Sequence, residues 1–97
     1  MEEKNLSDYR EEIDAADKAL LAAFVKRMEV SAHIAEYKRA HGMQILDAAR
    51  ESEKLARVAA AVPDAMGEYA QTLYSLLFSL SRDYQKKCGE SAEKSDM

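Results

Sequence analysis

The longest hydrophobic pattern of the chain covers about residues 7–41, and its apolar positions recur at alternating steps of three and four. This spacing predicts an amphipathic α-helix with a heptad-like seam. Ser7 is a plausible N-cap, and Gly42 fits the end of the helix because glycine favours the turn that follows one. The apolar positions of the seam are Ile13, Ala16, Leu20, Phe24, Val30 or Ser31, Ile34 and Tyr37.

A helix of this length is unusual in so short a chain. At about 1.5 Å per residue it would be about 50 Å long. A domain of about 100 residues has a radius of gyration of only about 13 Å. The helix therefore needs a partner along its whole seam, and the simplest partner is a second copy of itself.

Two further helices are predicted after a short connection. Asp47 is the expected N-cap of a helix that runs to about Ala61, and Pro63 interrupts it. Asp64 can cap a third helix, which we expect to end near Lys86. The sequence thus predicts an all-α fold with one long first helix and two shorter helices. Their apolar positions are Ala48, Ser52, Leu55, Ala59 and Val62 in the second helix, and Tyr69, Leu73, Leu76, Leu77, Leu80 and Tyr84 in the third.

Length and composition limit the possible classes of protein. The 97 residues make one domain, with an expected disordered N-terminus at 1–5, a folded domain at 6–87 and a flexible C-terminal tail at 88–97. A net charge of −4 argues against a general binder of nucleic acid or of anionic membranes. The single cysteine, Cys88, excludes an internal disulfide, and no apolar run is long enough for a membrane span. We therefore expect a cytoplasmic protein.

Cationic residues interrupt the apolar seam of the first helix. Arg27 and Lys38 are eleven residues apart, so they face the same way with their Cα atoms about 16 Å apart. Two long cationic side chains at this distance could hold a small dianion between them, or they could pair with acidic residues or reach to water. Arg10 lies on the same seam about 42 Å from Lys38, so only the Arg10 of an antiparallel second chain could approach Lys38. The alternative for Arg10 is an ordinary surface position.

Two polar groups lie on the shorter helices. Asp47, Arg50 and Glu51 open the second helix, where the alternative to a binding role is an N-cap followed by a surface ion pair. Ser81 and Gln85 lie one turn apart at the edge of the third helix's apolar face, where the alternative is a solvent-exposed polar pair. The sequence has no metal-ligand spacing, no glycine-rich phosphate loop and no nucleophile–base pair, so we expect no metal and no cofactor.

Taken in order, these residues resemble the all-helical chorismate mutase family over about residues 6–86. The resemblance rests on the ordered set, because each piece alone is weak. The set consists of Arg10-Glu11-Glu12-Ile13-Asp14-x-x-Asp17, Leu20-Leu21, Arg27, Tyr37-Lys38, Ile45-Leu46-Asp47-x-x-Arg50-Glu51 and Ser81-x-x-x-Gln85. It implies an intertwined homodimer whose long first helices cross between subunits, giving a six-helix bundle with two active sites.

The resemblance also implies a reaction and roles. Chorismate would rearrange to prephenate in one pericyclic step, as in phenylalanine and tyrosine biosynthesis. Arg27 and the partner's Arg10 would bind the substrate's carboxylates, and Lys38 and Gln85 would donate to the breaking ether oxygen. Glu51 would accept from the ring hydroxyl with Arg50 beside it. Asp47 and Ser81 would line the pocket.

One departure and three alternatives accompany the resemblance. Many family members have proline just before the Ile45 position, whereas this chain has Gln44, which makes the connection less rigid. Isochorismate-pyruvate lyases and aminodeoxychorismate mutases share the scaffold, and a non-catalytic helical dimerisation module is the third alternative. The intact Asp47-x-x-Arg50-Glu51 and Ser81-x-x-x-Gln85 elements favour the mutase. A non-catalytic module would have no reason to place cations on its seam, because burying unpaired charge is costly.

Overall fold

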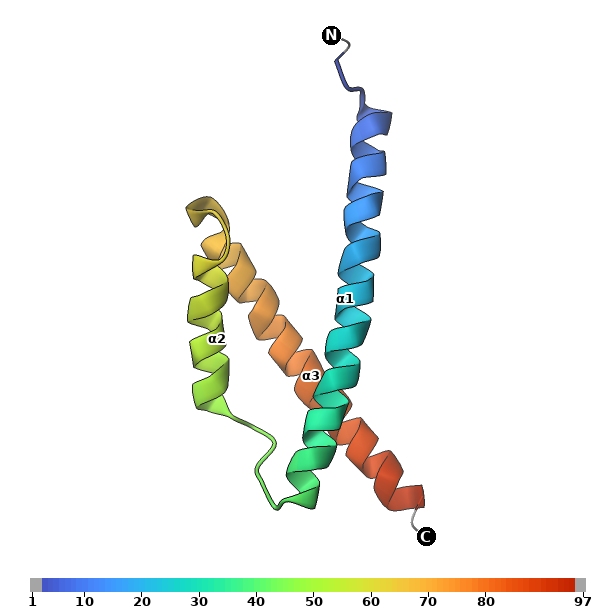
Figure 1. Ribbon diagram of the computed structural model, residues 1–97, viewed down its shortest axis with the longest axis vertical. Coiled ribbons are helices and arrows are strands. Elements are labelled where there is room, and N and C mark those ends of the chain that lie inside the picture. Colours follow the sequence, from blue (N-terminus) through green and yellow to red (C-terminus); the bar gives the residue numbers. More distant parts are fainter. Residues whose placement is uncertain (1–2, 96–97) are drawn as a thin grey trace. The chain divides into compact units, whose positions relative to one another are not determined.

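A computed structural model describes residues 3–95 of the chain, with side chains for residues 3–90. Its elements are α1 (Leu6–Ala40), α2 (Ala48–Ala60), the 3₁₀-helix η1 (Asp64–Met66) and α3 (Gly67–Ser95) (Figure 1). No strand occurs among the described residues, which confirms the predicted all-α fold with one long helix and two shorter ones. Residues 1–2 and 96–97 of the expected loose termini lie outside this description.

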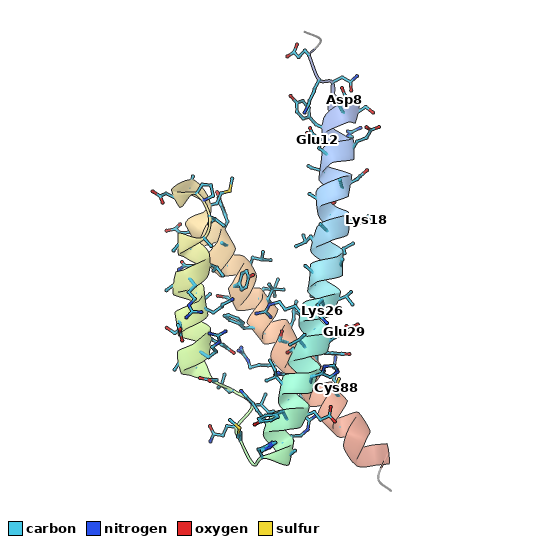
Figure 2. All side chains as sticks on the ribbon, in the orientation of Figure 1. Asp8, Glu12, Lys18, Lys26, Glu29 and Cys88 are labelled. Carbon is cyan, nitrogen blue, oxygen red and sulfur yellow. The ribbon has the colours of Figure 1, made fainter. Side chains whose placement is uncertain are left out.

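The chain divides into two compact units, Met1–Val30 and Ser31–Met97, and the boundary falls inside α1. The first unit consists mainly of the α1 turns before residue 31, and nearly all its described side chains are exposed. Figure 2 shows these side chains around the helix, with Asp8, Glu12, Lys18, Lys26 and Glu29 labelled. Such a helix contributes little apolar burial of its own and needs a tertiary or quaternary partner for stability.

The start of α1 is fixed by a reciprocal cap between Asn5 and Asp8. The Asp8 backbone N–H donates to Asn5 Oδ1 at 3.0 Å, and the Asn5 N–H donates to Asp8 Oδ2 at 3.0 Å. This arrangement satisfies two of the free N–H groups at the helix start. The prediction of Ser7 as N-cap is therefore wrong, because Ser7 lies inside the first turn.

The end of α1 follows the glycine signal in the sequence. Gly42 has a φ of 64°, a left-handed conformation that glycine adopts without steric cost. The Met43 N–H donates to Lys38 O at 2.8 Å, and the Gly42 N–H donates to Arg39 O at 3.3 Å. These two bonds form a Schellman motif, which satisfies carbonyls left free at the helix end and turns the chain toward α2.

Asp47 caps α2 as predicted. Its Oδ1 accepts a hydrogen bond from the Arg50 backbone N–H at 3.0 Å. In the second unit α2 packs against α3, and Val58 is the buried apolar residue of α2 (Figure 1). The Gln71 amide of α3 donates to Leu55 O at 3.2 Å, which adds a polar tie between the two helices.

The third helix differs from the prediction at both ends. Asp64 does not cap α3 but opens η1, and α3 begins at Gly67. The predicted end near Lys86 is wrong, since α3 continues to Ser95. Gly89 lies within α3 and close to the last turn of α1: a Cβ there would be 3.0 Å from Arg39 Nη1. Within residues 3–95, no helix is both long and apolar enough to cross a membrane.

Candidate active site

Buried polar side chains gather where the last turns of α1 and the second half of α3 meet in the second unit. On α1, Ser31 and Ala35 are 8% and 0% exposed, and on α3, Ser81 and Gln85 are 7% and 8% exposed. The four-residue spacing puts each pair on one helix face. At this position a side chain of α3 reaches the backbone of α1.

Gln85 makes the key contact at this position. Its Nε2 donates to the backbone carbonyl of Ser31 at 2.8 Å. A primary amide has two N–H donors and one carbonyl acceptor, and the Ser31 carbonyl occupies one donor. The contact therefore fixes the amide's orientation while leaving donor capacity for a ligand. The alternative of a solvent-exposed Ser81–Gln85 pair is wrong, because both residues are buried.

Lys38 is held at the connection between α1 and α2. The side chain is half-buried, and its Nζ donates to the carbonyl of Ile45 at 3.1 Å. An ammonium has three N–H donors, of which this carbonyl takes one. Instead of the alternative pairing with an acidic residue, Lys38 has a neutral backbone partner, so the positive charge at this position is not cancelled by that contact.

The acidic and basic residues that open α2 have different partners. Asp47 uses its carboxylate for the helix cap, which confirms the structural part of its prediction, and Arg50 is exposed. Glu51 does not pair with Arg50. Its Oε2 accepts from Nη1 of Arg82, a residue of α3 that is not among the predicted site residues. The available signal was its position next to Ser81 and one turn before Gln85.

The eight predicted site residues fall into two groups. Six of them belong to the second unit, and each contact described for these six lies within that unit. The six are Lys38, Asp47, Arg50, Glu51, Ser81 and Gln85. Arg10 and Arg27 belong to the first unit, where Arg10 is exposed and Arg27 is half-buried. Across residues 3–95, no group of three or more His, Cys, Asp or Glu side chains could hold a metal ion.

The described part of the chain is thus all-helical, and Lys38 and Gln85 are each held by a backbone carbonyl. The sequence profile of the family described as chorismate mutase type II matches residues 9–86. The chain belongs to this family and is an isomerase of the chorismate mutase type. No curated protein and no solved structure gives a significant match.

Proposed function

We propose that the chain rearranges chorismate to prephenate without a cofactor, by restraining the substrate's conformation and stabilising the charge that develops on its ether oxygen. The observation that carries this proposal is the family match over residues 9–86, a range that contains all eight predicted site residues. The reaction is an intramolecular pericyclic step, so it needs no nucleophile, metal or proton relay. The protein's task is to fold a flexible dianion and to place donors where charge accumulates.

Lys38 and Gln85 are the proposed donors to the ether oxygen. That oxygen becomes more negative as its bond to carbon breaks, so donors fixed in advance stabilise the transition state more than the ground state. Both side chains are already oriented by backbone carbonyls, Lys38 by Ile45 and Gln85 by Ser31. Each still has donor capacity beyond that one contact.

The remaining residues bind the substrate. Arg27 binds one substrate carboxylate and Arg10 of the partner subunit binds the other, because a guanidinium fork is well suited to a carboxylate. Glu51 accepts a hydrogen bond from the ring hydroxyl, and Arg50 lies beside it in sequence. Asp47 and Ser81 line the pocket, and the capping role of Asp47 keeps the start of α2 in place.

We further propose that the active form is an intertwined homodimer, a six-helix bundle with two shared sites. Support comes from the large apolar side chains that α1 exposes on one face before residue 31; Leu6 and Ile13 are each 63% exposed and Leu20 is 57% exposed. An exposed apolar stripe marks an interaction surface, and a second copy supplies a matching one through two-fold symmetry. We also propose that the reaction belongs to phenylalanine and tyrosine biosynthesis and that the protein acts in the cytoplasm.

The test of this function is a product assay. The purified chain is incubated with chorismate and, in separate reactions, with isochorismate and aminodeoxychorismate; loss of each substrate is followed by absorbance and the products are identified by mass spectrometry. We expect turnover of chorismate, with prephenate as the sole product. Salicylate and pyruvate from isochorismate would instead indicate a lyase on the same scaffold, an aminodeoxychorismate substrate would indicate the related mutase, and no turnover of any of these would indicate a binding module.

The pH dependence of a Gln85→Glu variant tests the donor role of Gln85. A carboxyl group donates only when protonated, so the variant should be active at low pH and lose activity as pH rises through the carboxyl's pKa. An ordinary Glu has a pKa of about 4.3, and burial at this position raises it. Above that pKa, kcat of the variant should fall about tenfold per pH unit, while kcat of the wild type stays nearly flat.

Gln71→Glu is the matched control. Gln71 also donates its amide to a helix carbonyl, that of Leu55, but at the α2–α3 contact. Its variant should keep the wild-type pH profile wherever it is folded by circular dichroism. A flat profile for Gln85→Glu, or the same decline in both variants, would contradict the donor role.

A further inference from the structure

One ion pair connects α2 and α3 in the second unit and involves Arg82, a residue that has no part in the proposed mechanism. Arg82 Nη1 of α3 donates to Oε2 of Glu51 on α2, 31 residues earlier in the chain. The two side chains are 39% and 27% exposed, so the pair is partly shielded from water. By contrast, Arg57 and Glu53 form an exposed pair within one turn of α2, a type that contributes little to stability.

We propose that Arg82 is a positioning residue, which holds the Glu51 carboxylate ready to accept the substrate's ring hydroxyl. This inference rests on the proposed function, because it takes Glu51 as the group that binds that hydroxyl. Arg82 occupies one oxygen of a carboxylate that has about four lone-pair sites in total, so acceptor capacity remains for a ligand. Fixing a flexible Glu side chain in advance removes the entropy cost of ordering it on binding.

The charge of Arg82 gives a second reason for the arrangement. A lone carboxylate beside a dianionic substrate would repel it, and this repulsion is strongest where water is excluded. With Arg82 attached, the pair carries no net charge and still accepts a hydrogen bond. Arg82 also lies three residues before Gln85, which places both side chains on the same side of α3.

The role predicts a particular kinetic signature. The ring hydroxyl is unchanged between substrate and transition state, so its contact contributes equally to both, and losing it should raise KM more than it lowers kcat. We expect Arg82→Met to raise KM about tenfold, the scale of a weakened hydrogen bond to a charged group, with kcat within about threefold of wild type. Arg82→Lys, which keeps the charge but not the fork, should recover part of the loss.

The experiment compares the wild type with Arg82→Met, Arg82→Lys, Glu51→Gln and the double variant that combines Arg82→Met with Glu51→Gln. Arg57→Met is the matched control. The double variant should be no worse than Glu51→Gln alone, because both changes remove one interaction. With a chorismate analogue that lacks the ring hydroxyl, Arg82→Met and wild type should have the same KM. If Arg82→Met does not fold, the test compares KM of Arg82→Lys and of the wild type, with chorismate and with the analogue.

The outcomes separate this proposal from the function on which it rests. A wild-type chain without mutase activity overturns both. If the wild type is active, two results would overturn only the positioning role. One is a KM of Arg82→Met within about twofold of the wild-type KM, and the other is that the effects of the two substitutions multiply in the double variant. A loss of thermal stability in Arg82→Met without any change of KM would also overturn it and would leave the pair as a structural tie.

Discussion

Replacing Lys38 with alanine should lower kcat by at least about 100-fold, the scale of losing one donor aimed at developing negative charge. The half-buried ammonium already has a fixed position, set by its hydrogen bond to the Ile45 carbonyl. A donor that is oriented before the reaction needs no reorganisation as the C–O bond breaks, so its loss affects the transition state more than the bound substrate. We therefore expect a smaller change in KM than in kcat, measured by chorismate consumption at saturating substrate.

Two further variants distinguish chemistry from folding in this experiment. Lys38→Met keeps the aliphatic stem but removes the charge, and it should lose as much kcat as the alanine variant. Lys87→Ala removes an exposed lysine of α3 that pairs with Asp83 one turn away, and it should behave as wild type. Near-normal turnover in folded Lys38→Ala would contradict the assigned role.

Mixing two inactive variants should restore activity if each active site takes residues from two chains. Arg10→Ala removes a substrate-binding guanidinium supplied by one subunit, and Lys38→Ala removes a donor supplied by the other. A mixed dimer then has one site with both defects and one with neither. Random exchange of equal amounts makes half of the dimers mixed, so recovery should approach about a quarter of wild-type activity.

The result depends on proof that the subunits exchange. Variants that carry different affinity tags allow the mixed dimer to be isolated, and native mass spectrometry gives its fraction. Each unmixed variant should stay at least about 100-fold below wild type under the same conditions. Isolated mixed dimers with no more activity than the parents would show that Arg10 does not complete a site of the other chain.

The helices were predictable because their signals are local. The three/four spacing predicts α1, Gly42 follows its end and Asp47 caps α2, as the structure shows. Each of these signals depends only on residues within a turn or two of the backbone. The errors lie where a local signal has a competitor. Asn5 and Asp8 form a reciprocal cap that outweighs Ser7, and α3 continues past Lys86 and through Gly89, which lies close to the Arg39 side chain.

The contacts of the site were less predictable because they join distant segments. The sequence puts Ser81 and Gln85 on one helix face, but only the tertiary structure shows that both are buried and that Gln85 donates to the Ser31 carbonyl of α1. Glu51 has arginines at positions 50 and 82 as possible partners, and the packing of α2 on α3 selects Arg82. Side-chain pairing of this kind follows from tertiary structure rather than from spacing along the chain.

The most direct test of the account is a crystal structure of the protein with a stable bicyclic ether dicarboxylate, shaped like the folded transition state. We expect a dimer in which Lys38 Nζ and Gln85 Nε2 both lie about 2.7–3.2 Å from the ether oxygen. Arg27 and Arg10 of the partner subunit should each contact a carboxylate of the same ligand. A ligand bound elsewhere, or an ether oxygen without contact to Lys38 and Gln85, would contradict the proposed mechanism.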